Sequence, residues 1–196
     1  MSLHILQLVN RLSDLKLKAR TGWNMTFEPR DRYKTRCVPE AESVADHTYA
    51  LAMHAFLVAI ELGLDVEKAV TMALIHDAPE SITGDGVTAT LSPEERELAL
   101  KDKKTIECAA ARELFLPHGK LGQRCYELWL EYEAQECEEA RIVFQLDKFE
   151  CAAQAVVYAK QGHRLDPIEF IDYAAGHITH PLIASMLDEL RKEWTS

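Results

Sequence analysis

The chain has 196 residues, a length that suits one domain with a sizeable hydrophobic core better than two small domains. Its 47% of hydrophobic and 28% of charged residues are typical of a soluble globular protein. A net charge of −10 argues against a surface that coats nucleic acid, because such a surface needs a basic face. No apolar segment is long enough to span a membrane. We therefore expect a single domain over 1–196 with no nucleic-acid or membrane partner.

The five cysteines are odd in number, scattered along the chain, and form no C-x-x-C pair. Free thiols in a reducing cytosol fit this pattern better than a thiolate metal site. The N-terminal residues are periodic rather than a long apolar run, so they do not resemble a secretory signal. We expect a cytoplasmic protein.

Apolar residues at helical spacing predict a first amphipathic helix that ends near residues 20–22. Its apolar stripe consists of Leu3, Leu6, Val9, Leu12, Leu15 and Leu17. The pattern lapses over 24–41, where two prolines flank a run of basic residues. A second helix is predicted over 44–62 and stops at Gly63, and its inward stripe includes His47.

Asp65 is the predicted N-cap of a third helix. That helix ends at His76 and Asp77, because Pro79 disfavours helical backbone in the residue before it. Later helices are predicted over 93–116 after a capping box at 92–95, over 121–132, over 138–160, after Asp166, and after His180. No segment alternates as a strand would, so the predicted fold class is all-α.

The end of the third predicted helix has the composition of a metal site. His76 and Asp77 are followed by Glu80 and, after a glycine, by Asp85. Imidazole and carboxylate together suit borderline divalent metals, and hydrolysis needs a spare carboxylate near the metal to move protons. A His-Asp pair alone occurs by chance. Here it is accompanied by a histidine and an aspartate on other predicted helices, His47 and Asp147.

These four residues form the ordered H…HD…D pattern of the HD-domain metal-dependent phosphohydrolases, which the chain strongly resembles. Five spaced blocks narrow the resemblance to the 5'-deoxynucleotidase branch, over about residues 6–187. The blocks are residues 19–23, 42–47, 74–85, 128–133 and 145–147.

The resemblance implies an all-α enzyme that hydrolyses deoxyribonucleoside 5'-monophosphates to deoxynucleoside and phosphate. One divalent metal would be held by His47, His76, Asp77 and Asp147. Such a ligand set suits Co, Mn, Fe, Ni or Zn, and Mg less comfortably. The resemblance also implies a homodimer, with exposed apolar residues on the late helices as its interface.

By resemblance, Glu80 and Asp85 take part in catalysis rather than in metal ligation. We assign proton handling at the attacking water to Glu80, and leaving-group protonation or water positioning to Asp85; these roles are interchangeable at this stage. Arg20 offers a planar fork to phosphate oxygens, and Trp23 offers a flat apolar wall to a sugar or base. The resemblance gives Trp23 a part in disfavouring a ribose 2'-hydroxyl, whereas an isolated tryptophan is more often a core residue.

Four further residues near these motifs, one aspartate and three histidines, are better explained by capping or packing than by metal binding. Asp46 either caps its helix, which we favour, or orients a metal ligand, and His54 belongs to the core or lies behind the ligands. His177 and His180 have helical metal-ligand spacing, but Pro181 favours capping or packing there.

Three features depart from the 5'-deoxynucleotidase pattern. The connection from Trp23 to His47 is longer than is usual in these nucleotidases. We interpret its basic residues as a solvated loop; the alternatives are that they add phosphate contacts or form a lid. The segment after Asp85 lacks a proline, and Phe144 replaces a lysine. The alternatives are an HD phosphohydrolase for another nucleotide or phosphomonoester, and an inactive nucleotide-binding protein. The presence of all six metal-site and catalytic residues argues against inactivity.

Overall fold

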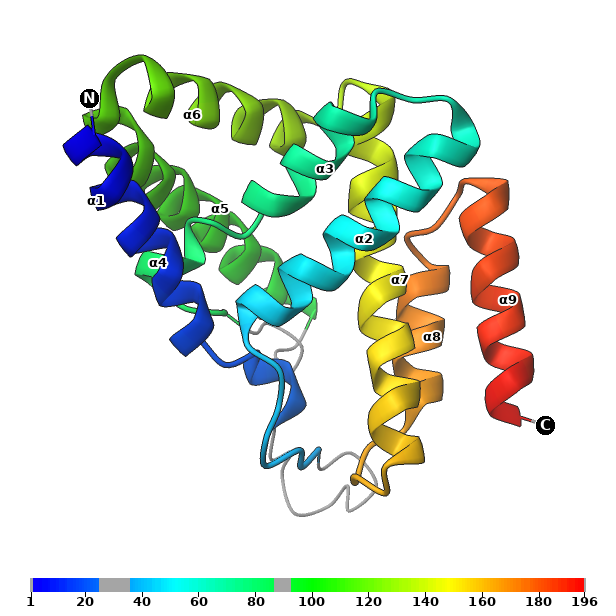
Figure 1. Ribbon diagram of the computed structural model, residues 1–196. Helices are drawn as coiled ribbons and strands as arrows, with labels where there is room; N and C mark the ends of the chain where they lie inside the picture. The colour runs from blue at the N-terminus through cyan, green and yellow to red at the C-terminus, as the bar shows by residue number, and fades with distance from the viewer. Residues whose placement is uncertain (1, 25–35, 87–92, 196) are drawn as a thin grey trace.

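Helices supply the regular secondary structure of the computed structural model, which describes residues 2–24, 36–86 and 93–195 (Figure 1). In chain order they are α1 (Ser2–Ser13), η1 (Asp14–Leu17), η2 (Thr21–Trp23), α2 (Val44–Leu62), α3 (Val66–Ile75), α4 (Glu80–Thr83), α5 (Pro93–Phe115), η3 (Leu116–His118), α6 (Gly119–Ala134), α7 (Glu138–Lys160), α8 (Pro167–Ala175) and α9 (Pro181–Thr195). Two isolated β-bridges are the sole extended pairings within the described ranges. The all-α prediction is therefore confirmed. None of the described helices is long and apolar enough to cross a membrane.

The predicted helix ends correspond to side-chain caps. Ser43 and Asp46 form a reciprocal capping box at the start of α2, which confirms capping as the role of Asp46. Gly63 ends α2 with a φ of 67°, a left-handed conformation that favours glycine. Asp65 and Asp166 each accept a backbone N–H at 3.0 Å at the starts of α3 and α8. The predicted cap at Ser92 lies outside the described residues.

The first helix differs from its prediction. The α-helix ends at Ser13, and a 3₁₀ turn, η1, continues the chain to Leu17. Leu8 and Leu15 are buried, whereas Leu3, Leu6 and Val9 from the predicted stripe are exposed. A repeat of three residues falls behind the 3.6-residue turn, so those residues drift away from the face that packs against the protein.

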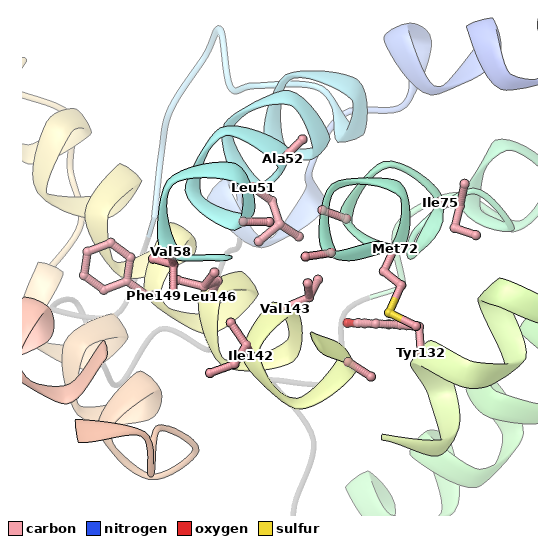
Figure 2. Packing of buried hydrophobic residues seen from close by; sticks show 14 of the residues in the cluster. Leu51, Ala52, Val58, Met72, Ile75, Tyr132, Ile142, Val143, Leu146 and Phe149 are labelled. Carbon is pink, nitrogen blue, oxygen red and sulfur yellow. The ribbon is translucent and has the colours of Figure 1, made fainter. Parts of the chain in front are cut away.

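The core lies between α2, α3 and α7. Fully buried alanines, among them Ala55 and Ala73, allow α2 and α3 to pack closely. Figure 2 shows Leu51, Met72 and Val143 pointing into this core from α2, α3 and α7. Figure 1 shows α1, α4, α5 and α6 on one side of α2 and α3, and α8 and α9 on the other side, beyond α7. The three packed helices therefore set the relative positions of the side chains that they direct toward one another.

The chain turns sharply after α3 and leads into the short helix α4, which the sequence pattern did not predict. Glu80 is the first residue of α4, and its backbone N–H donates to the Asp77 carbonyl at 2.9 Å. The indole N–H of Trp129 donates to the His76 carbonyl at 3.1 Å from the neighbouring helix α6. These bonds fix the backbone on which His76, Asp77 and Glu80 stand.

Candidate metal centre

Two buried imidazoles face each other between α2 and the end of α3. His47 lies in the first turn of α2, and His76 follows the last residue of α3; their ring centroids are 5.3 Å apart. The Nε2 atoms of both rings are buried and have no hydrogen-bond partner. A buried polar atom without a partner is costly, so two such nitrogens at one place are suited to bind a ligand.

The other nitrogen of each ring is held by an acceptor. His76 Nδ1 donates to the Ala73 carbonyl at 2.8 Å, and since a carbonyl only accepts, the proton lies on Nδ1. His47 Nδ1 lies 2.5 Å from a carboxylate oxygen of Glu150. The bond at His76 leaves its Nε2 lone pair free for a metal, the tautomer that ligation requires. His47 has the same tautomer when its Nδ1 proton is donated to Glu150 and Nε2 carries none.

Two carboxylates complete the cluster. Asp147, from the middle of α7, places Oδ1 3.2 Å from His47 Nε2. Asp77 Oδ2 lies 3.0 Å from His76 Nε2 and 3.9 Å from His47 Nε2. Ligand atoms around a common ion with bonds near 2.1 Å lie roughly 3 to 3.5 Å apart. The structure therefore brings the four predicted metal ligands together. Donor atoms of His47, His76 and Asp147 all lie within 4.8 Å of one another, a spacing that can hold a metal ion, and Asp77 lies beside both imidazoles.

Each acid of the site has a cationic neighbour. Lys148 Nζ lies 2.6 Å from Asp147, Arg20 Nη1 lies 3.4 Å from Asp77, and Lys103 Nζ reaches from α5 to within 3.5 Å of Glu80. Burial by itself would raise the pKa of Asp147, but Lys148 and then His47 outweigh it and hold that pKa well below its usual range. Asp147 is thereby kept ionised, which is the form that metal binding requires.

Glu80 is almost fully buried beside this cluster. Its Oε2 has no hydrogen-bond partner. Burial first, and then the charges of Asp77 and Asp85, raise the pKa of Glu80 to about 9, although Lys103 opposes this shift. A cation bound nearby would act in the same direction as Lys103 and favour the ionised form. Glu80 is therefore a group whose proton affinity depends on what the site contains.

Asp85 anchors the segment that carries Arg20. Its Oδ2 accepts from the Thr21 backbone N–H at 2.7 Å and from the Thr21 hydroxyl at 3.0 Å. The Arg20 guanidinium lies between Asp77 and Cys151, with Nη2 2.9 Å from the Cys151 sulfur. Burial would lower the pKa of Arg20, but Cys151 and Asp77 raise it, so the side chain stays charged. Arg20 is thus positioned at the edge of the cluster of acids.

Trp23 belongs to a smaller hydrophobic cluster and is 2% exposed. Its ring stacks on Phe170 at 4.9 Å and meets Tyr158 edge-on, and its indole N–H donates to Glu42 at 2.9 Å. The indole nitrogen is already used within the protein. Its predicted contact with a sugar or base stays a prediction, and such a contact would involve the ring alone.

The contact between Trp23 and Glu42 leads to a prediction about stability. Burial and the charge of Glu150 raise the pKa of Glu42 from 4.5 to about 7. Between these pH values the folded protein keeps a proton that the unfolded chain has lost, so the free energy of unfolding falls as pH rises. Glu42→Gln keeps an acceptor for Trp23 and should be more stable than the parent above pH 7 by about 1–3 kcal/mol.

Urea unfolding at pH 4 and pH 8 measures this gain, which should appear only at the higher pH. Glu40→Gln, at an exposed position two residues away, is the matched control and should show no such difference. A gain of equal size at both pH values would contradict the electrostatic explanation.

Several residues near the cluster were missed or left open by the sequence. Lys103 and Lys148 carried no pattern that distinguishes them from surface lysines. Lys148 Nζ also lies 4.9 Å above the ring of Phe144, the residue that replaces the family lysine. Glu150 lies one turn beyond Asp147 on the same face of α7, a spacing that could have revealed it.

The remaining histidines do not join the cluster. His54 is half-buried and packs edge-on against Phe149 at 5.6 Å. His177 Nδ1 is hydrogen-bonded to the Tyr173 carbonyl, and the His180 backbone N–H donates to Gln145 at 2.7 Å. Of the basic segment 24–41, most lies outside the described residues, and Arg36 pairs with Glu169 at 3.2 Å.

The chain is similar to several known proteins. The chain is 34% identical to the 5'-deoxynucleotidase HDDC2 of Homo sapiens, over 96% of this chain and 85% of that one. It is 35% identical to the 5'-deoxynucleotidase HDDC2 of Bos taurus, over 97% and 85%. A conserved hypothetical protein from Pyrococcus furiosus has the same fold, with a TM-score of 0.69, 27% identity, and coverage of 95% and 99%. The family profile of the HD domain matches residues 13–181, and the chain therefore belongs to the HD domain family.

Proposed function

We propose that this protein is a metal-dependent phosphomonoesterase that releases phosphate from deoxyribonucleoside 5'-monophosphates. The observation that carries the proposal is the pair of buried, unpartnered Nε2 atoms facing two carboxylates, with a separate buried acid, Glu80, beside them. The relatives named 5'-deoxynucleotidase support the choice of substrate.

In this proposal His47, His76, Asp77 and Asp147 hold one divalent ion. Imidazole and carboxylate donors favour Co, Mn, Fe, Ni or Zn over Mg. When bound, such an ion polarises a phosphoryl oxygen and makes a nearby water more acidic. The protein then has to bind the phosphate dianion, orient the water and move two protons.

The cations of the site are suited to the phosphate. Arg20 presents a planar fork, and Lys103 and Lys148 add charge from α5 and α7. A water oxygen attacks phosphorus as the bond to the nucleoside 5'-oxygen breaks. Glu80 takes the proton of the water. The departing 5'-oxygen receives a proton, which we assign to Asp85 directly or through a water that it positions.

Phosphate release by metal-stripped protein tests the proposal. Co, Mn and Mg are restored singly, with matched deoxyribo- and ribonucleoside 5'-monophosphates as substrates. Metal-dependent release that favours the deoxy series is the expected result. Release without sugar preference would retain the hydrolysis and remove the substrate assignment, and no release with any metal would overturn the proposal.

We also propose that the protein is a homodimer, as the 5'-deoxynucleotidase resemblance implies. Five exposed apolar side chains follow one face of α2: Tyr49, Met53, Phe56, Leu57 and Ile60. A continuous apolar stripe is typical of an interface, and in a two-fold dimer it can pack against its own copy. We propose α2 rather than the late helices as the interface, because Val157 and Tyr173 are the exposed large apolar side chains among the described residues of α7 to α9.

A charge on this stripe should separate the subunits. Phe56→Glu combined with Leu57→Glu should change the mass measured by sedimentation from two chains to one, because two buried charges would face their own copies. Leu17→Glu is the matched control, since Leu17 is 83% exposed but lies off the stripe. If the double variant still sediments as two chains, α2 is not the dimer interface.

A further inference from the structure

Glu150 is a buried acid that has no part in the proposed hydrolysis. It is 2% exposed and lies on α7, one turn after Asp147. Its Oε2 lies 2.5 Å from His47 Nδ1, across 103 residues of sequence. One helix therefore contacts both nitrogens of the same imidazole, with Asp147 at Nε2 and Glu150 at Nδ1.

The surroundings of Glu150 make a purely structural role a poor explanation. A carboxylate in the interior costs free energy unless a partner compensates it, and His47 is the side chain that bonds it. A second acid, Glu42, is near enough for the charge of Glu150 to raise its pKa. An apolar residue at position 150 would remove this repulsion but would leave His47 Nδ1 without its acceptor, so the bond to His47 is what the acid contributes here.

We propose that Glu150 is a positioning residue of the metal centre and acts through His47. By accepting the Nδ1 proton it fixes the tautomer and the plane of the ring, so that the Nε2 lone pair faces His76, Asp77 and Asp147. The negative charge also makes the imidazole a stronger donor. This inference rests on the proposed function, because it assumes that the cluster holds a metal.

A different role for Glu150 is disfavoured by its neighbours. Donor atoms of His47, Glu150 and Cys151 also lie within 4.8 Å of one another, which raises the question of a second ion on this side of the ring. The guanidinium of Arg20 lies 2.9 Å from the Cys151 sulfur and would repel such an ion. Burial raises the pKa of the Cys151 thiol well above its ordinary value, which opposes the thiolate that a metal needs.

The test compares cobalt binding by the full chain and by Glu150→Gln and Glu150→Leu, using calorimetry and the visible spectrum of the bound cobalt. The glutamine retains an acceptor without the charge, and the leucine retains neither. We expect affinity to fall by about 10-fold for glutamine and up to about 100-fold for leucine. Without metal, the melting temperature of the glutamine variant should equal that of the parent, because the acceptor for His47 is retained. Glu139→Gln, on the same helix and paired with Lys68, is the matched control and should bind cobalt like the parent.

Equal cobalt affinity in the parent and both Glu150 variants would overturn the inference and leave the proposed function intact. A thiolate-to-cobalt band that disappears in Cys151→Ser would also overturn it, because Glu150 would then belong to a ligand set. A parent protein that binds no cobalt or other divalent metal would overturn the proposed function itself, and the inference with it.

Discussion

Replacing Glu80 by glutamine should lower kcat by about 10²- to 10⁴-fold, the usual contribution of a proton-transferring side chain. Glu80 is buried beside the metal cluster but its carboxylate is no part of the converging donor set, and its Oε2 is free of protein partners. The amide has the same shape but cannot take a proton from water. Metal content, measured by atomic absorption on the purified variant, should therefore equal that of the parent.

The matched control is Glu107→Gln. Glu107 and Glu80 contact the same ammonium group, at 3.3 and 3.5 Å from Lys103 Nζ. If activity depended only on the charge balance around Lys103, both variants would be impaired alike. We expect Glu107→Gln to keep kcat within a few-fold of the parent. If Glu80→Gln retained its activity, Glu80 would not be the proton-transferring residue. If the variant lost its metal, Glu80 would be a metal ligand.

The helices were predictable because their signals are local. Ser43 with Asp46, Asp65 and Asp166 cap helices within three residues, and Gly63 ends α2 through its own φ angle. The metal motif was readable through its resemblance to the ordered HD-domain pattern, because no single residue of the pattern indicates a metal by itself. The convergence of His47, His76, Asp77 and Asp147 is the three-dimensional form of that pattern.

Contacts between distant elements were not predictable. Lys103 contacts Glu80 from 23 residues further along the chain, and nothing in its sequence neighbourhood distinguishes it from a surface lysine. The burial of Trp23 depends on Tyr158 and Phe170, from helices more than 130 residues away. The prediction for the first helix was wrong because its apolar residues fit a three-residue repeat. The side chains that are buried against the protein are Leu8 and Leu15. Tertiary partners therefore decided what local spacing left open.

Asp147→Asn should remove most of the thermal stabilisation that a divalent metal gives the parent. At a free metal concentration about 100 times its dissociation constant, binding contributes about 2.7 kcal/mol and raises the Tm of a protein of this size by about 5–10 °C. Asp147 Oδ1 faces His47 Nε2 from α7 and joins that helix to the ligands of α2 and α3. If asparagine weakens binding 100-fold, the same metal concentration gives a rise of only about 1–2 °C.

Scanning calorimetry of the parent and the variant, each with and without cobalt, measures the two rises. The comparison is made within each protein, so it is independent of what the variant loses by leaving Lys148 without its 2.6 Å partner. Asp172→Asn is the matched control, because Asp172 is an exposed aspartate that pairs with Arg191 away from the cluster. It should show the full rise. An Asp147→Asn protein with the full rise would mean that α7 does not ligate the ion, and the metal would then be held by α2 and α3 alone.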